Sequence, residues 1–284
     1  TVNELDGVWG TSASNVWAVG YETILHYDGA TWSTVAGGSG STLFGIWLFG
    51  IWGSSASDIW AVGYQAGGTP VIFHYDGVNW SSVPSPSTEL QYTSVSGSSA
   101  SDVWAAGPRG FISHYDGTSW SNVPTGANQV LVAVWASSPS DVWAVGIDGT
   151  FHYNGTSWAP VTNLSGEFMG LSGTSQSDVW AVGHAGPSHY DGTSWSSGPQ
   201  ESALPEFALG VWASSRTDAW AVGVNTVNTG SGYVSKIAHY NGTTWSDVGM
   251  GKSSALLVAV WGSSATDVWV VGDGGTILHG TPTR

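Results

Sequence analysis

Residues 140–158, with the sequence SDVWAVGIDGTFHYNGTSW, carry the pattern that decides the fold. A strand-like DVWAVG is followed by a short loop and by a second strand-like segment that ends in His152-Tyr153. An Asn154-Gly155 turn then leads into a segment that opens on Trp158. The first Trp of this pattern recurs at positions 17, 60, 104, 143, 180, 220 and 269, at intervals between 37 residues (143 to 180) and 49 residues (220 to 269). The chain is therefore predicted to repeat one structural unit seven times.

Each repeat supplies strand-like segments of four kinds. The first ends in Val-Trp-Gly or a variant, such as Val95-Ser96-Gly97 or Val134-Trp135-Ala136, and a turn of the SSASD type leads into the DVWAVG segment. Four short antiparallel strands repeated in tandem are typical of propeller blades, and a single unit of this size must stack on its neighbours. We predict an all-β chain, a seven-bladed β-propeller of four-stranded antiparallel blades. It forms one domain over residues 1–284, with the repeated Trp side chains packed between blades.

The last repeat lacks a Trp-bearing fourth segment after Ile277-Leu278-His279-Gly280. We expect one end of the chain, Thr1-Val2 or residues 281–284, to complete the blade that the other end begins.

The composition excludes several classes of function. Only 9% of the residues are charged, whereas Gly (41) and Trp (19) are abundant, which is typical of short strands and tight turns. The formal net charge of −15 disfavours nucleic acids and anionic lipid surfaces as partners. No apolar run is long enough for membrane insertion, and the absence of Cys excludes thiol chemistry. We expect a secreted or extracytoplasmic bacterial protein that is mature or trimmed, because the chain opens without a Met.

An Asp-Gly or Asn-Gly pair joins the third and fourth segments, as at Asp28-Gly29. Such pairs favour a two-residue type I′ hairpin, in which both residues have positive φ. This predicts Tyr27 opposite Ala30, and it places Leu25, Tyr27 and Trp32 on one face of the blade.

An Asp stands two residues before the second-strand Trp in six repeats, with Asn15 in the first. We predict that these side chains bond nearby backbone amides and fix the turn. There is no DxDxDG calcium loop, and one His per blade places neighbouring His residues too far apart to share a zinc ion. No metal and no cofactor are therefore expected.

The His-Tyr pair that ends the third segment is the first candidate for ligand binding. Aromatic faces beside hydrogen-bonding groups suit sugar rings, so we predict carbohydrate sites between blades. The residues concerned are His26, His74, His114, His152, His189, His239, Tyr27, Tyr75, Tyr115, Tyr153, Tyr190 and Tyr240.

The second candidate is the face on which the repeats vary. The loops after each Val-Gly differ in length and are predicted to be long at residues 64–70 and 224–235, and loops on a rigid scaffold commonly carry function. The residues expected to surround the channel there are Tyr21, Glu22, Tyr64, Gln65, Arg109, Asp148, His184, Asn225, Lys236 and Asp273. An inserted apolar segment, Phe44 to Trp47, precedes the regular first strand of the second repeat. It is predicted either to tuck against the blade or to form a contact patch for a partner.

The repeat VWAVG…HYDG…W resembles bacterial propeller repeats related to tectonin-type lectins. The segment VWVVGDG, continued by residues 275–279, more distantly resembles the Asp-box propellers of photosystem assembly factors and sialidases. These resemblances imply a propeller and, for the lectins, glycan binding. Asp116 to Trp120 is one residue shorter than an Asp box, and only Arg109, Arg216 and Arg284 are available for the arginine triad of sialidases. A sialidase is therefore not expected.

We expect a non-catalytic binding module and not an enzyme, because the chain has no GxSxG or HExxH motif. The expected partner is a glycan or glycoconjugate. The alternative is a protein-interaction scaffold that uses the variable loops. A hydrolase that pairs Glu22 with Asp273 is the third hypothesis.

Overall fold

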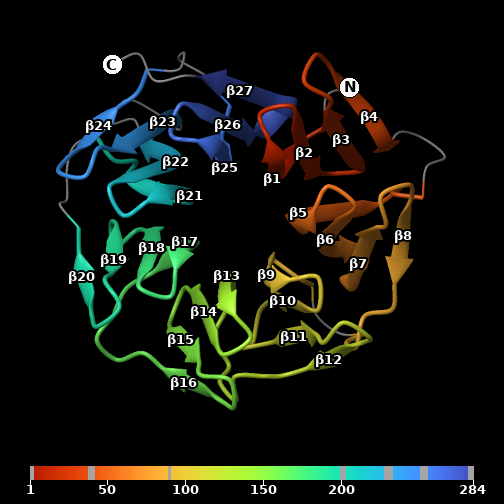
Figure 1. Ribbon diagram of the computed structural model, residues 1–284, viewed down its shortest axis with the longest axis horizontal. Helices are drawn as coiled ribbons and strands as arrows, with labels where there is room; N and C mark the ends of the chain where they lie inside the picture. The colour runs from red at the N-terminus through yellow and green to blue at the C-terminus, as the bar shows by residue number, and fades with distance from the viewer. Residues whose placement is uncertain are drawn as a thin grey trace.

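A computed structural model describes residues 3–37, 42–88, 91–198, 203–226, 233–249 and 255–280. Seven antiparallel sheets stand around a central axis, as the view down that axis shows (Figure 1). In each blade the chain starts at the innermost strand and moves outward (Figure 1). The only helical element among the described residues is the short 3₁₀ turn η1 (Asp273–Gly275). The predicted all-β, seven-bladed propeller is confirmed.

The strands follow the four-part repeat. Blades one to four contain β1 (Leu5–Ser12), β2 (Asn15–Gly20), β3 (Thr23–Tyr27), β4 (Trp32–Gly37); β5 (Ile46–Ser55), β6 (Asp58–Gln65), β7 (Thr69–Tyr75), β8 (Trp80–Val83); β9 (Ser94–Ser99), β10 (Asp102–Ala106), β11 (Ile112–Tyr115), β12 (Trp120–Asn122); and β13 (Leu131–Ser138), β14 (Asp141–Gly146), β15 (Thr150–Tyr153), β16 (Trp158–Pro160). Blades five to seven contain β17 (Phe168–Ser175), β18 (Asp178–Gly183), β19 (Ser188–Tyr190), β20 (Trp195–Ser197); β21 (Phe207–Ser215), β22 (Asp218–Thr226), β23 (Tyr233–Tyr240), β24 (Trp245–Asp247); and β25 (Leu257–Ser264), β26 (Asp267–Gly272), β27 (Thr276–Gly280).

The seventh blade has three strands, β25, β26 and β27, within the described residues. The ring closes by packing, since Leu5 and Val16 of the first blade share a core cluster with Trp269 and Val271 of the last. Thr1-Val2 and residues 281–284, which we expected to supply a fourth strand, lie outside the described residues.

The core lies between the blades, in seven clusters of which each joins two neighbouring sheets. At the junction of the third and fourth blades, Trp104 stacks on His114 of its own blade, with 4.0 Å between ring centroids. Tyr153 and Trp158 of the next blade contact the same indole at 5.0 and 5.8 Å. Five further junctions repeat this arrangement. The predicted role of the second-strand Trp residues as inter-blade spacers is confirmed.

The second-strand Asp residues bind side chains, not the backbone amides that we expected. Asp102 accepts hydrogen bonds from Ser98 Oγ (2.5 Å), His114 Nε2 (2.7 Å) and Trp104 Nε1 (2.9 Å). Burial would raise the pKa of Asp102, but these hydrogen bonds together hold it below its ordinary value. A hydroxyl, a carboxylate (or Asn15) and a His recur together in every blade. Sequence position alone could not show that these groups reach across strands.

The Asx-Gly connections are longer than predicted. Tyr27 pairs with Trp32 and not with Ala30, so four residues form the loop. Asp28 accepts hydrogen bonds from the amides of Ala30 and Thr31, both at 2.9 Å, and only Gly29 of the pair has positive φ. Because the register differs from the prediction by two residues, Tyr27 and Trp32 still share a face, as expected.

The innermost strands show a size complementarity between blades. The first-strand Trp of one blade lies over a Gly of the next, as with Trp9 over Gly53, where an added Cβ would come within 2.6 Å of the indole. The third blade has Ser96 in place of this Trp, and the fourth blade has Ala136 in place of the Gly. Ser96 Oγ accepts a hydrogen bond from the Ala136 amide at 3.3 Å. The same exchange recurs at Ser172 and Ala213. A Trp on one blade is thus matched to a Gly on the next, and a Ser to an Ala.

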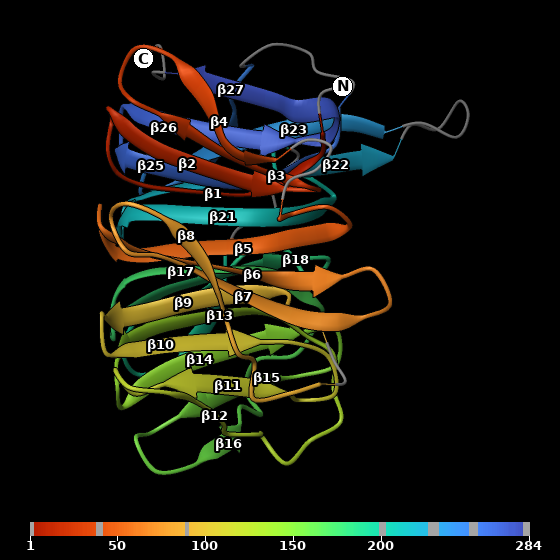
Figure 2. The ribbon, with the colours of Figure 1, turned by 90° about the vertical axis from the view of Figure 1, so that its right-hand side faces the viewer.

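Two connections predicted as loops are largely strand. Tyr64 and Gln65 end β6, and Thr69-Pro70 begin β7. Residues 224–226 extend β22 and residues 233–235 open β23, while residues 227–232 lie outside the described part of the chain. These two hairpins project beyond the other blades on one face, here called the variable face (Figure 2).

Candidate functional site

The predicted inter-blade residues are already engaged in contacts within the protein. Each His ring binds the second-strand Asp or Asn15 of its own blade, as in His152 to Asp141 at 2.6 Å. Each Tyr packs on a Trp of the preceding blade, as in Tyr190 on Trp143 at 4.8 Å. The structure brings the His and Tyr residues to the junctions but pairs them with protein groups there. Carbohydrate binding by these twelve residues stays a prediction.

The channel wall contains a more distinctive feature. The first strands of six blades carry a β-bulge near the variable face, and the bulged residue has no Cα partner on the second strand. A bulge redirects a side chain away from the regular pleat. The bulged residues are Asp6, Phe49, Val132, Met169, Leu209 and Val258, and all six line a central cavity of about 380 Å³.

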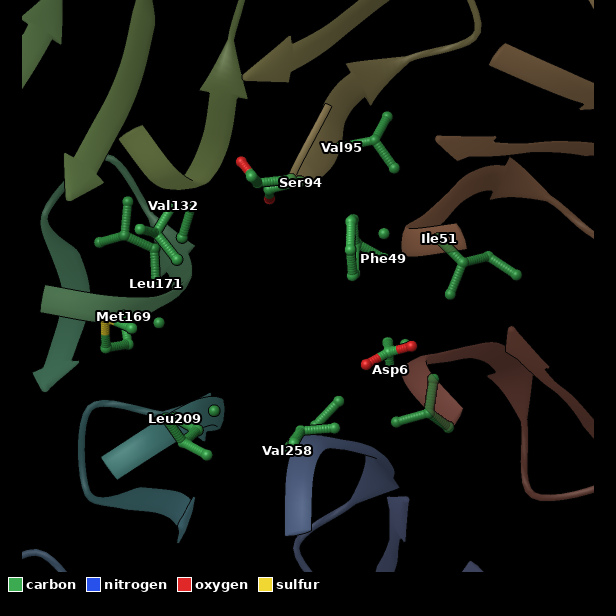
Figure 3. A pocket seen from close by; sticks show the side chains of 18 of the residues that line it. Asp6, Phe49, Ile51, Ser94, Val95, Val132, Met169, Leu171, Leu209 and Val258 are labelled. Atoms are coloured by element: carbon green, nitrogen blue, oxygen red, sulfur yellow. The ribbon is translucent and has the colours of Figure 1, made fainter. Parts of the chain in front are cut away.

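Most side chains that line the cavity are apolar, Gln91, Thr93 and Ser94 add polar groups, and Asp6 is the single carboxylate among its described lining residues. Figure 3 shows Asp6 directed into the cavity, with Met169, Leu171 and Leu209 on the opposite side. Asp6 Oδ2 is buried, and no described group forms a hydrogen bond of good geometry with it, although the Trp47 indole lies close enough to the carboxyl group to lower its pKa. A buried acceptor without a partner is costly, so this oxygen is available to a ligand that brings a donor.

Two more carboxyl groups lie close to Asp6. Glu4 lies directly before β1, the strand that contains Asp6, and Asp273 comes from η1 in the seventh blade. Burial, the charge of Glu4 and the charge of Asp273 raise the pKa of Asp6 to about 7 against a smaller opposing effect of the Trp47 indole. Burial and then the neighbouring Asp273 also raise the pKa of Glu4. None of the described Lys or Arg side chains forms an ion pair with this acidic cluster of Glu4, Asp6 and Asp273.

An aromatic surface borders the acidic cluster. Trp47, at the start of β5, lies 4.5 Å from Tyr21 and 6.0 Å from Tyr64 between ring centroids, and Phe49 stacks on Tyr64 at 5.6 Å. All four rings are half-buried. Within the inserted segment, Ile46 is buried against the blade, as the first alternative predicted, whereas Phe44 is 66% exposed. Contact of this segment with a partner stays a prediction.

The predicted variable-face residues separate into two groups. Tyr21, Tyr64 and Asp273 belong to the aromatic surface or to the acidic cluster. Glu22 instead accepts a hydrogen bond from the Gly45 amide at 2.8 Å and supports the inserted segment, with φ of 51°. Gln65 ends β6 beside Tyr64, and the remaining residues lie on the third to sixth blades.

On those other blades, His184 pairs with Glu167 at 2.8 Å, Arg109 sits in the β10–β11 connection with φ of 61°, and Asp148 is exposed in the β14–β15 connection. The carboxylate neighbour of Asp273 is Glu4 and not Glu22, so the pair that the hydrolase hypothesis requires is not formed among the described residues.

Sequence reasoning missed Asp6 and Glu4, although a signal was present. Position 6 aligns with Phe49, Val132, Met169, Leu209 and Val258, and with Thr93 in the third repeat. An acid at a position that is apolar in five of the six other repeats was the clue, and only the bulge showed that this position faces the channel.

The raised pKa of Asp6 predicts a pH dependence of stability. Between about pH 4 and pH 7 the folded chain keeps a proton that the unfolded chain has released, so the free energy of unfolding should fall as the pH rises through this window. Asp6→Asn, which is neutral at every pH, should reduce this fall by about 1 kcal/mol or more. Urea denaturation at both ends of the window measures it, with Asp148→Asn as the control. An unchanged slope in Asp6→Asn would contradict the assigned pKa.

These features define the class of the protein as a seven-bladed β-propeller whose channel is lined mostly by apolar side chains, with an acidic and aromatic mouth on the variable face. The chain matches no protein-family model, and no curated protein matches its sequence. Solved structures do match. The structure is similar to YCF48 bound to a D1 peptide, with a TM-score of 0.74 and 17% identity over 100% of this chain and 95% of that one.

It is also similar to a virginiamycin B lyase from Staphylococcus aureus with quinupristin (TM-score 0.77, 10% identity, 99% of this chain and 96% of that one). The WD40 propeller domain of Doa1 gives a TM-score of 0.71 with 11% identity, over 98% of this chain and 92% of that one. At these identities the likeness shows the fold alone. None of the comparisons bears on the resemblance to tectonin-type lectins.

Our expectation that the chain is not an enzyme is corrected by these matches. Two of the similar propellers are lyases, one for streptogramin B and one for virginiamycin B. The same fold therefore serves catalysis, and the absence of two hydrolase motifs was too narrow a basis for that expectation. The described residues contain no helix with the length and apolar character needed to cross a membrane.

Proposed function

We propose that the chain binds a protein partner through the variable face, and that the partner places a basic side chain at Asp6. The observation that carries this proposal is the buried Asp6 Oδ2, which has no hydrogen-bond partner of good geometry among the described residues and lines a cavity whose side chains are mostly apolar. A Lys or Arg side chain matches both features, because its methylene stem suits apolar walls while its charged end suits a carboxylate.

Charge supports the same partner. Glu4 and Asp273 add negative charge beside Asp6, and the whole chain carries a formal net charge of −15. A field of this sign attracts basic segments and raises their association rate. The half-buried rings of Tyr21, Trp47 and Tyr64 give the partner an apolar and cation-accepting surface beside the carboxylates.

YCF48, a propeller of similar structure, binds a D1 peptide, which supports peptide binding by this fold. Carbohydrate binding at the blade junctions was our first expectation, and a glycan array remains its test. The described contacts favour the channel mouth instead. Asp6 Oδ2 lacks a hydrogen-bond partner among the described residues, whereas the His and Tyr residues at the junctions already contact protein groups.

A peptide array tests the proposal. Each member has the same neutral sequence with a single Lys, Arg or norleucine at its centre. Members with Lys or Arg should be retained and those with norleucine should not, because norleucine keeps the stem and lacks the charge. Asp6→Asn should weaken retention by about tenfold, the loss expected for one charge-assisted contact. Asp148→Asn, an exposed acid on the same face, should change it little. Equal retention of all three peptides, or no effect of Asp6→Asn, would exclude the proposed site.

A further inference from the structure

We propose that the outer edge of β27 is a docking site for an extended peptide segment that carries a Trp and adds a fourth strand to the seventh blade. This edge lies on the outer rim of the ring, away from the channel mouth (Figure 1). The proposal is therefore independent of the function proposed above.

The first observation is the unpaired edge. β27 pairs with β26 from Thr276 opposite Gly272 to Gly280 opposite Val268, and no described strand lies on its other side. The third strand of every other blade pairs on both sides. An unpaired edge presents a row of N–H and C=O groups that can pair with another chain.

The second observation is a direct comparison inside the molecule. β3 and β27 begin with the same four residues, Thr-Ile-Leu-His. β3 is covered by β4, and its Ile24 is fully buried. The equivalent Ile277 has no such cover and is half-buried. Because the two sequences are identical, the difference in exposure comes from the fourth strand and not from the residues themselves.

The other blades show the same contrast. In three of the other blades the residue equivalent to Ile277 is also Ile, namely Ile72, Ile112 and Ile237, and each is at most 3% exposed. The His279 side chain is 43% exposed, whereas the other His side chains paired with an Asp are between 15% and 31% exposed. A fourth strand would cover apolar surface here that all other blades already bury.

The third observation concerns the junction between the sixth and seventh blades. At the six other junctions a Tyr and a Trp of one blade contact the second-strand Trp of the blade before it, but Gly280 stands where that Tyr would be. Trp220, although buried, has only His239 as a ring neighbour among the described residues. A cavity of about 590 Å³ lies at this junction and is lined by His239, Ser246 and Thr266, among others.

The chemistry of the occupant follows from β4, which is the natural partner of a Thr-Ile-Leu-His strand in this chain. In blade one Trp32 stands opposite Tyr27, Ser33 opposite His26 and Thr34 opposite Leu25. A strand of the same type on β27 would place its Trp opposite Gly280, beside the cavity. Backbone pairing supplies the attachment, and the Trp supplies the anchor.

The experiment adds a synthetic peptide that copies residues 29–37, GATWSTVAG, to the full chain and follows amide hydrogen exchange by mass spectrometry. Exchange of residues 276–280 should slow by about tenfold or more, since strand pairing protects edge amides. Replacing the peptide Trp by Ala should weaken binding by about tenfold. A peptide that is N-methylated at the Ser and the Thr directly after its Trp should not bind. It keeps its side chains but loses the backbone N–H donors of these two residues.

Two controls make the result interpretable without a mutation in the seventh blade. The amides of β3 should exchange as before, because β4 already covers them. Asp6→Asn should leave peptide binding unchanged, which separates this edge from the channel mouth. The proposal is overturned if the peptide fails to bind. It is equally overturned if binding leaves β27 unprotected or releases β4 from β3.

Discussion

Trp104→Ala is expected to lower the free energy of unfolding by about 3–5 kcal/mol, the range for removing a large aromatic ring from a core. Trp104 is 1% exposed and lies between two blades, where His114, Tyr153 and Trp158 surround its indole. Its Nε1 also donates to Asp102, so the truncation leaves a buried carboxylate with one donor fewer. Urea denaturation followed by Trp fluorescence and by circular dichroism measures the loss, and agreement between the two probes tests two-state unfolding.

Phe44→Ala is the matched control for this prediction. Phe44 is also aromatic and apolar, but it is 66% exposed on the variable face. Its truncation should change the free energy of unfolding by less than about 0.5 kcal/mol. A Trp104→Ala loss of a similar small size would show that the repeated indoles do not hold the blades together.

The fold was predictable because the same pattern of strands and turns occurs seven times in the sequence. A Trp two residues after an Asp, and an Asx-Gly pair between strand-like segments, recur at matching positions, so errors in any one repeat are averaged out. The predicted length of the Asx-Gly connections was wrong, because it was inferred from the dipeptide alone. Asp28-Gly29 suggested a two-residue turn, but the Asp28 side chain binds two following amides and lengthens the loop to four residues.

The candidate site was less predictable because the residues that form it are brought together by ring closure. Glu4 and Asp6 stand at the beginning of the chain and Asp273 near its end, and only the packing of the first blade on the last makes them neighbours. Trp47 lies at the same channel mouth because β5, the first strand of the second blade, is lengthened and pairs Trp47 with Tyr64 of β6. The seven-fold repeat predicts that the first and last blades are neighbours, but the spacing does not show which of their side chains meet at the channel mouth.

Gly53→Ala is expected to lower the free energy of unfolding by about 1–3 kcal/mol, as overpacking of a filled core does. The added Cβ would lie 2.6 Å from the Trp9 indole and 2.7 Å from the Asp58 carbonyl oxygen. The chain itself shows how such a clash is avoided. Where the preceding blade has Ser96, the next blade carries Ala136 at the matching position, opposite Val142 as Gly53 is opposite Ile59.

The double variant Trp9→Ser, Gly53→Ala copies this Ser–Ala pairing, and its cost should be lower than the sum of the two single costs by about 1 kcal/mol or more. Trp9→Ser alone leaves a cavity over Gly53, which the Ala methyl partly fills. The reverse exchange provides a second cycle: Ser96→Trp should destabilise strongly alone and less when combined with Ala136→Gly. Additive costs in both cycles would show that the Trp–Gly and Ser–Ala pairs are coincidental. Coupling in both would show that the inner wall of the channel is selected as pairs of residues across blades, so that no position on a first strand can be interpreted without its neighbour on the next blade.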